Sequence, residues 1–435
     1  MNPRNYFLWL LLSGLFLFRL AFGLSLRFWS EDELQTYLIG LKYALTGLWP
    51  YFGPDLVGSE TSFKTQIPGA LEGLVIGLPL RLCPIPESPF ILLNLLSYGS
   101  LVLLAWYAVK RIPRLSFPLT LVWLSIAPWS LQLSTHMVNS SFVLFGSVLF
   151  FVGFLESHPV FRVGAVPEPL ANAFMGFGLG WVMQFHMSWV LLPAFLAASL
   201  GGQAKAGKIK IPCFWVGLGF LLPASLLLPS LFRYGLLQAG SGAGFASAFN
   251  ENNLLAFFTI LARYLSLASF EMPRFLGAHT ADRVAFLMGH PWILVPGLFL
   301  WGAGIFQALV LLTEWFRPRH PQTDWKKIKT LAALGFLEIY VSFWFTVKMP
   351  LSHIYYVTFP LVMIYSLYVW SLWASHPYGK RWVIAFLVIG FFFECGDRMA
   401  LFPGDSLYQN RGAVVKAMAD RDYREVGERR PGSLY

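Results

Sequence analysis

Apolar runs of nearly membrane-spanning length recur along the whole chain and constrain its fold more than any other feature. The first is Tyr6–Leu24, the last covers about 380–396, and few charged residues interrupt them. A helix needs about 20 apolar residues to cross a bilayer, and backbone polar groups in lipid must be satisfied within the protein. Strands of a transmembrane barrel would alternate polar and apolar residues, which these runs do not. The sequence therefore predicts an all-α integral membrane protein.

We expect a polytopic bundle of about 11 transmembrane helices, the first of them retained and not a cleaved signal peptide. The expected spans are, approximately, 6–24, 88–109, 115–134, 139–155, 168–184, 186–200, 212–231, 290–314, 328–347, 353–374 and 380–396.

Composition agrees with this class and excludes others. Of 435 residues only 12% are charged, whereas soluble domains carry about a quarter. The three cysteines, Cys83, Cys213 and Cys395, form no CxxC pair, so neither a disulfide framework nor a zinc site is expected. The net charge of +10 comes from basic residues concentrated in loops between apolar runs, so it indicates membrane topology and not nucleic-acid binding.

The distribution of Lys and Arg among the loops predicts the orientation of the bundle in the membrane. Short segments rich in Lys and Arg follow the even-numbered spans, at 110–114, 205–210, 317–329 and 380–381, whereas the opposite loop 135–138 has neither residue. Because cytoplasmic loops are enriched in Lys and Arg, we predict a cytoplasmic N-terminus. The protein would be a multi-pass protein of the plasma membrane, the inner membrane of a bacterium, with its remaining loops on the periplasmic or extracellular face.

This topology divides the chain into a transmembrane module, residues 1–396, and a short polar outer tail, residues 397–435. Two long outer segments, 25–88 and 232–289, interrupt the module. In the first, Glu33–Thr46 has apolar residues at helical spacing before Gly47, which predicts an amphipathic helix on the membrane surface. Residues 66–82 and 253–270 are expected to form similar surface or half-inserted helices. No internal repeat is visible, which argues against a transporter built from inverted repeats.

Three consecutive acids, Glu31, Asp32 and Glu33, open the first outer segment of a chain that has only 22 acids. Neighbouring carboxyl groups raise one another's pKa, which suits a general base. The alternative is a helix start in which Ser30 is the cap and the acids interact favourably with the helix dipole. We favour the catalytic interpretation, with Asp32 first and Glu33 second.

Other outer-face residues are candidates for binding. Cations stabilise the charge that develops on a departing phosphate, although a lone Lys or Arg at a span end commonly just reaches the membrane interface. The candidate cations are Lys64, Lys348, His353, Arg263, Arg274 and Arg283. The candidates for contact with substrate are Tyr37, Tyr355, Tyr356, His136, Asn139 and His186, although a lone His at a helix end is more often structural. Arg19 and Glu338 lie inside expected spans, where we expect helix–helix pairing.

Two groups of these residues resemble a known family. Asp32-Glu33 with Tyr37, then Gly47 before Trp49-Pro50, then Phe63-Lys64, follow the first span in an order similar to that of the C-type (GT-C) membrane glycosyltransferases. That family uses polyprenyl-phosphate sugar donors and includes protein O-mannosyltransferases and the aminoarabinose transferases of lipid A. The resemblance covers most of the chain as an architecture, and as motifs about 28–80 and 345–362.

The second motif lies near the late spans. Lys348-Met-Pro-Leu-Ser-His353, followed by Tyr355, Tyr356 and Pro360, is similar to the basic residue, Tyr and Pro that open a late span in the family. The chain differs from the family in having Lys64-Thr-Gln-Ile-Pro68 where Lys-Pro-Pro is frequent, and a short tail where the family has a large soluble domain.

The resemblance implies an inverting glycosyltransferase that moves a sugar from a polyprenyl-phosphate donor to a lipid, glycan or protein acceptor. It implies Asp32 as general base, Glu33 or Glu31 as a positioning group, and the outer cations as contacts of the donor phosphate. No cofactor is expected, and a divalent metal held by the acids, as in oligosaccharyltransferases, is not favoured. Two alternatives stay open: a non-catalytic lipid-linked-sugar binder or flippase, and a secondary transporter for an anionic solute.

Overall fold

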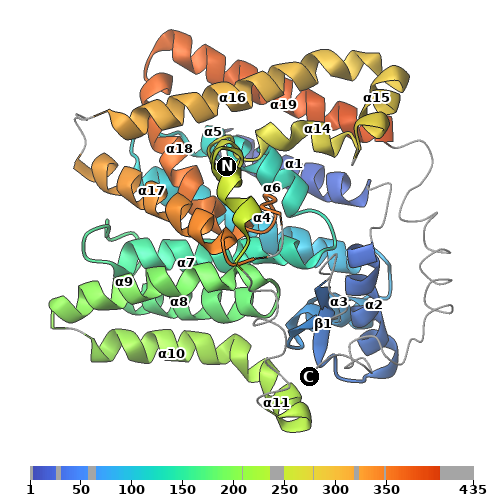
Figure 1. The fold of residues 1–435 in the computed structure, drawn as a ribbon, viewed down its shortest axis with the longest axis vertical. Coiled ribbons are helices and arrows are strands. Elements are labelled where there is room, and N and C mark those ends of the chain that lie inside the picture. The colour runs from blue at the N-terminus through green and yellow to red at the C-terminus, as the bar shows by residue number, and fades with distance from the viewer. Residues whose placement is uncertain are drawn as a thin grey trace.

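The computed structural model describes residues 3–25, 31–56, 65–207, 209–235, 249–277, 279–317, 323–346 and 349–401. Helices make up nearly all of this part of the chain (Figure 1). The first elements are α1 (Pro3–Leu24), α2 (Glu31–Thr46), β1 (Phe52–Leu56), β2 (Thr65–Pro68), α3 (Leu71–Leu82), α4 (Ser88–Arg111), α5 (Phe117–Ile126), α6 (Pro128–Leu133), α7 (Val143–Ser157), α8 (Glu168–Met183), α9 (Leu192–Lys205), α10 (Lys210–Ala224) and α11 (Leu228–Tyr234).

The later helices are α13 (Phe257–Leu265), α14 (Met272–Phe275), α15 (Thr280–Gly289), α16 (Leu294–Phe316), α17 (Thr323–Phe343), α18 (Phe359–Ala374) and α19 (Pro377–Leu401). Short 3-10 turns precede or connect several of them, at η1 (Asn139–Phe142), η2 (Met187–Leu191), η3 (Ser225–Leu227), η4 (Glu251–Ala256), η5 (Ser269–Glu271), η6 (Pro291–Ile293) and η7 (Tyr356–Thr358).

Seven helical stretches of the described residues are long and apolar enough to cross a membrane. They are Tyr6–Leu24, Ser88–Arg111, Asn139–Ser157, Met187–Lys205, Lys210–Tyr234, Pro291–Phe316 and Tyr356–Ala374. The prediction of a helical membrane protein is confirmed at this level. The other expected spans are also helical, but they are short, interrupted or more polar, so the total of about 11 stays a prediction.

One expected span, 115–134, is divided into α5 and α6. The break lies at Ala127, whose extended backbone (φ −56°, ψ 130°) precedes Pro128, because proline disfavours helical geometry in the residue before it. Arg19 of α1 is fully buried beside the break, and it donates hydrogen bonds to the Ser125 carbonyl (2.8 Å) and the Ser134 hydroxyl (2.6 Å). Arg19 therefore joins α1 to the freed polar groups of the break, and not to an acid on another helix.

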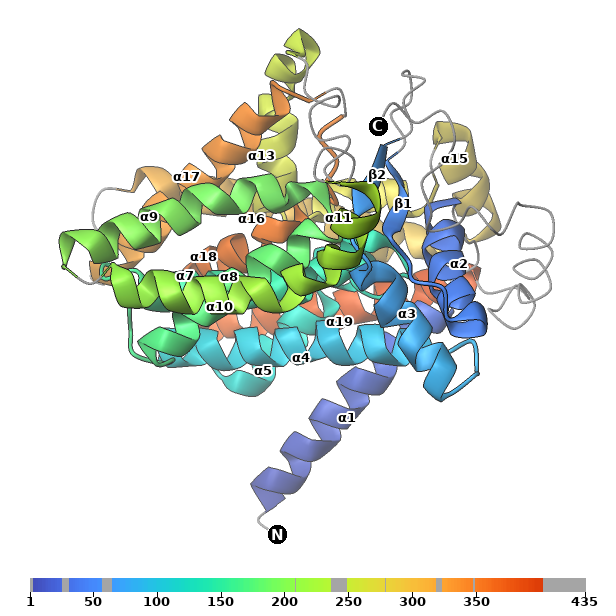
Figure 2. The same ribbon diagram turned by 90° about the horizontal axis from the view of Figure 1, so that it is seen from below.

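The first outer segment combines helices with a small sheet, which the expectation of an all-helical protein missed. β1 and β2 pair antiparallel with Phe52 opposite Pro68, and they lie beside α2 and α3 (Figure 2). The expected helix over 66–82 is thus β2 followed by α3. The expected helix before Gly47 is confirmed as α2, and Gly47 ends it with a positive φ of 71°. α2 packs on α3, where the Thr36 hydroxyl donates to the buried Glu72 carboxylate at 3.0 Å.

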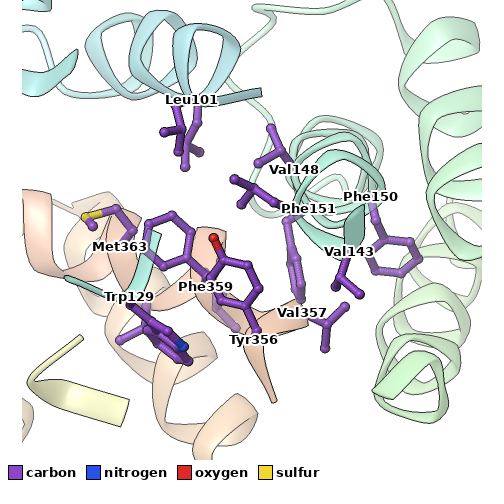
Figure 3. Packing of buried hydrophobic residues seen from close by; sticks show 14 of the residues in the cluster. Leu101, Trp129, Val143, Val148, Phe150, Phe151, Tyr356, Val357, Phe359 and Met363 are labelled. Carbon is purple, nitrogen blue, oxygen red and sulfur yellow. The ribbon is translucent and has the colours of Figure 1, made fainter. Parts of the chain in front are cut away.

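The core of the bundle lies where α4, α7 and α18 meet. The stretch Asn139–Ser157 is 94% buried over its most apolar window, and Tyr356–Ala374 is 83% buried. Leu101, Val148, Phe151 and Phe359 fill the space between these helices, with Met363 beside them (Figure 3). Such side chains suit both a soluble core and a membrane bundle, because they interdigitate without polar atoms to satisfy.

Loops that follow even-numbered expected spans meet at one end of the bundle. Arg111, at the end of α4, forms a 2.9 Å ion pair with Asp324 of α17. Lys327 donates a 3.0 Å hydrogen bond to the Val160 carbonyl in the loop between α7 and α8. The Tyr107 hydroxyl donates to Glu156 at 2.9 Å in the same region. These contacts group three of the loops that the sequence analysis places on one side of the membrane.

Candidate functional site

The acidic triplet lies in the first turn of α2, as expected. The side chains of Glu31 and Asp32 lie outside the described part of the structure, so their predicted roles rest on the position of their backbone. Glu33 is described, and its carboxylate is buried, with 6% of the residue exposed. An acid buried in this way is not a solvated helix start, which makes the surroundings of Glu33 the natural centre of a candidate site.

Glu33 borders a buried polar cluster centred on Arg398. We define the Arg398 cluster by the residues Glu33, Gln132, His136, Glu394, Asp397 and Arg398. The Arg398 guanidinium donates to Nε2 of His136 at 3.0 Å and to Oε1 of Gln132 at 3.3 Å. The Gln132 amide donates in turn to Oε2 of Glu394 at 3.0 Å. Oε1 of Glu33 lies 3.8 Å from Nδ1 of His136. The cluster thus joins α2, α6, the turn after α6, and α19.

The contacts fix the state of His136. A guanidinium can only donate, so Nε2 of His136 is an acceptor and its single proton lies on Nδ1, which faces Glu33. Burial and the charge of Arg398 lower the pKa of His136 well below its ordinary value. His136 is therefore a neutral imidazole that links the arginine to the Glu33 carboxylate.

The Arg398 cluster contains more carboxyl groups than cations. Glu394 and Asp397 are almost completely buried, yet Oε1 of Glu394 and Oδ1 of Asp397 have no hydrogen-bond partner among the described residues. Arg398 also lies 3.9 Å above the ring of Phe22 at the end of α1. Buried polar atoms without partners are rare in folded proteins and require an explanation, which here includes binding of a ligand.

A second charged group brings together parts of the outer segments. Arg263 of α13 forms a 2.7 Å ion pair with Glu271, and Arg274 lies 3.7 Å from the same carboxylate. Arg263 also donates to the carbonyl of Pro350. We define the Arg263 pair as Arg263 and Arg274 with the shared Glu271. Two guanidinium groups against one carboxylate leave a net positive charge beside residues 349–353.

A cavity is lined by residues that neighbour the two charged groups. Its volume is about 90 Å³, and its lining includes Ser266, Leu267 and Ser269, which lie in sequence between Arg263 and Glu271, and Glu394 of the Arg398 cluster. Its walls are formed mainly by apolar residues of α16 and α19, with Trp123 and Trp370. Small-molecule sites in proteins have apolar walls with few polar groups, and this cavity shares that lining, although it is smaller than the roughly 300–1,000 Å³ typical of such sites.

Several predicted contact residues have structural partners. The Tyr37 hydroxyl donates to the Pro86 carbonyl at 3.4 Å, and Nδ1 of His186 accepts from the Ser188 amide at 3.1 Å as the cap of η2. Tyr355 and Tyr356 are fully buried around Trp129, with ring centroids 5.7 and 5.9 Å from its own. Figure 3 shows Tyr356 and Trp129. These two tyrosines therefore belong to the aromatic core, and their contact with a substrate stays a prediction.

The remaining candidates are distributed as follows. Lys64 and Lys348 lie outside the described residues, and His353 is half-buried in the turn before η7. Arg283, in α15, donates to the Gly277 carbonyl at 2.9 Å. Asn139 begins η1 and accepts a hydrogen bond from the Ser140 amide at 2.7 Å. Among the described residues, no group of three or more His, Cys, Asp or Glu is arranged to hold a metal ion.

Sequence reasoning missed the C-terminal half of the site. The expected outer tail begins at Asp397, but α19 continues to Leu401 and carries Glu394, Asp397 and Arg398 on its buried side. A signal was available, because residues at i, i+3 and i+4 share one face of a helix. Charged residues at 394, 397 and 398 therefore form a polar patch at the end of an apolar run.

Comparisons with known proteins identify no relatives. No family model matches the chain, and no curated protein or solved structure matches it either.

Proposed function

We propose that the chain is an inverting glycosyltransferase that moves a sugar from a polyprenyl-phosphate donor to a hydroxyl acceptor at the outer face of the membrane. The acceptor hydroxyl gives its proton to a carboxylate of the acidic triplet, and its oxygen forms a bond to the anomeric carbon. The bond from that carbon to the phosphate oxygen breaks, and the electron pair leaves with the phosphate. One well-placed carboxylate is enough for such a single displacement.

The observation that carries this proposal is the burial of Glu33 against His136 within the Arg398 cluster. A buried charged cluster at the end of an apolar bundle is costly and is typical of functional sites in membrane proteins. Asp32 precedes Glu33 in the same first turn of α2. We propose Asp32 as general base and Glu33 as the group that positions the acceptor, in the order that the resemblance to GT-C enzymes implies.

The departing phosphate would be stabilised by cations on the outer side. The Arg263 pair supports this role because its two guanidinium groups share the single Glu271 carboxylate. The contact of Arg263 with the Pro350 carbonyl brings the pair next to the segment that leads to His353, another proposed contact of the donor. Lys348, also proposed as a contact, lies outside the described residues. Guanidinium groups bind phosphate oxygens through directed, charge-assisted hydrogen bonds.

The test is transfer of labelled sugar in membranes that contain Asp32→Asn, Glu33→Gln or, as a control, Glu168→Gln, whose carboxylate pairs with Arg162 on the surface. The donor and product would first be identified by mass spectrometry of lipids and glycans from cells with and without the gene. We expect Asp32→Asn to lower the transfer rate by about 100-fold or more, as for loss of a general base. The Glu168→Gln control should retain full activity.

Undiminished transfer by Asp32→Asn and Glu33→Gln, at equal membrane expression, would overturn the assignment of a base to the triplet. If the unmodified protein transfers no sugar and both variants lose donor binding, the result would favour the non-catalytic binder or flippase.

One observation favours a second candidate, the secondary transporter. Glu394 is a fully buried acid within an expected span, and it lines a cavity inside the bundle. Acids in such positions often carry protons in transporters. Proteoliposomes with an imposed pH gradient distinguish the two functions, because a transporter accumulates its solute without forming a glycosylated product.

A further inference from the structure

We infer that the cavity between α16 and α19 binds a lipid that ends in a hydroxyl group, with the hydroxyl at Glu394. This inference rests on the proposed function, and it names the acceptor class that the proposal leaves open: a lipid alcohol. The cavity is lined by residues of both helices, and each helix also carries exposed apolar side chains such as Leu309 and Val388. α16 and α19 lie alongside each other in the fold (Figure 1).

The walls define the apolar part of the ligand. Leu300, Ala303 and Gly304 of α16 and Val383, Leu387 and Gly390 of α19 line the cavity. These side chains offer no hydrogen bonds, so they suit a hydrocarbon chain and not a sugar or a peptide. The volume of about 90 Å³ is below that of sites for whole drug-sized molecules, so the cavity accommodates only the hydroxyl end of a longer chain.

The polar end of the cavity defines the end group. Glu394 is fully buried and lines the cavity, and its Oε1 has no hydrogen-bond partner among the described residues. A hydroxyl can donate to a carboxylate or accept from a protonated carboxyl group, so it satisfies this atom in either state. A phosphate would place negative charge against a cluster that already has an excess of carboxyl groups. The end group is therefore a hydroxyl, and the phosphate of the donor belongs elsewhere.

The position of Glu394 connects the cavity to the proposed catalytic carboxylates. Gln132 contacts Glu394 at 3.0 Å and Arg398 at 3.3 Å, and Arg398 contacts His136, which faces Glu33. A hydroxyl held at Glu394 would lie at the edge of the same polar cluster that holds the first turn of α2. The Arg263 pair lies toward the other end of the cavity, near Ser266 and Ser269.

Photocrosslinking of the purified full-length protein in lipid nanodiscs tests this inference. The probes are a diazirine-bearing hexadecanol and the hexadecyl phosphate with the same chain, and the labelled peptides are identified by mass spectrometry. We expect the alcohol to label peptides of α16 and α19 that line the cavity, and the phosphate to label them at least about tenfold less. Glu394→Leu should reduce labelling by the alcohol about tenfold, as expected for loss of one hydrogen bond to a charged or buried acid.

Two matched controls separate binding from misfolding. Glu338→Leu removes a half-buried acid of α17 that does not line the cavity, and it should leave labelling unchanged. Ala303→Trp fills the wall and should abolish labelling, whereas Leu309→Trp adds the same ring on the exposed side of α16 and should not. Equal labelling of Glu394→Leu and the unmodified protein, or equal labelling by alcohol and phosphate, would overturn the inference.

The result of the photocrosslinking experiment does not depend on whether the protein transfers sugar. Specific labelling by the alcohol in a protein that transfers no sugar would refute the proposed enzyme and retain the binding site. Transfer to a non-lipid acceptor, with labelling spread over all lipid-facing helices, would refute the lipid alcohol and retain the enzyme.

Discussion

Arg398 sets the electrostatics of the candidate site through three different contacts. It donates to His136 and Gln132, and its guanidinium lies over the ring of Phe22. Each contact comes from a different element, so one side chain fixes α1, α6 and α19 relative to one another. Charged residues with their partners this deeply buried are usually retained for a specific arrangement and not for stability alone.

At the same scale, His136 predicts how stability depends on pH. Its pKa is lowered in the folded protein, so the unfolded chain binds its proton first as the pH falls through about 6.5. The free energy of unfolding is therefore highest above that pH. It decreases as the pH falls toward the lowered pKa of His136 in the folded protein. We expect the unfolding temperature in detergent to fall between pH 7 and pH 5, and to fall less in His136→Gln. The exposed His376→Gln is the control, and an identical pH dependence of all three proteins would contradict the assignment.

The residues of the site could be predicted only in part. Asp32-Glu33 stood out because acids are scarce and these follow the first span directly. Glu394 did not, because its contact with Gln132 joins residues 262 positions apart and depends on how α19 packs against α6. The surroundings of Tyr355 and Tyr356 could not be predicted either, and their contact with substrate stays a prediction. Their sequence context matches a family motif, but burial against Trp129 is decided by the tertiary fold.

Among the elements, α8 and α10 pack closely against each other, and small residues permit the close approach. A Cβ added to Gly219 of α10 would lie 2.1 Å from the carbonyl oxygen of Ala173, whereas one added to Gly217 would meet nothing within 4 Å. We expect Gly219→Ala to destabilise the protein by about 1–3 kcal/mol through overpacking. Gly217→Ala should be neutral or stabilising by up to about 1 kcal/mol, because alanine favours helix. Thermal unfolding in detergent gives the midpoint temperature of each of the two variants. Equal midpoint temperatures would refute the close packing at Gly219.

The sequence predicted helices correctly wherever a long apolar run was present. The helix that ends before Gly47 was also predictable, since a glycine at positive φ commonly ends a helix. β1 and β2 were missed because they are short strands of 5 and 4 residues without clear alternation. Pro128 indicates a break between α5 and α6, but the uninterrupted apolar run favoured a single span over 115–134.

For the whole molecule, the natural cysteines provide a test of topology. Cys83 follows α3 on the predicted outer side, and Cys213 lies at the start of α10 beside the predicted cytoplasmic loop; both are exposed. A membrane-impermeant maleimide added to intact cells should label Cys83 in the Cys213→Ser, Cys395→Ser variant. It should label Cys213 in the Cys83→Ser, Cys395→Ser variant only after permeabilisation. The reverse pattern would invert the topology and move the acidic triplet to the cytoplasm.

The burial of Arg19 has a consequence for the order of events during synthesis. α1 emerges from the ribosome first, but the Ser125 carbonyl that accepts its hydrogen bond follows 106 residues later. At translation rates of about 5–20 residues per second, the arginine waits roughly 5–20 s for its partner. During that interval it needs water, lipid headgroups or the insertion machinery as a temporary partner. The buried contacts of Arg19 in the first helix can therefore form only after α5 and α6 have been synthesised.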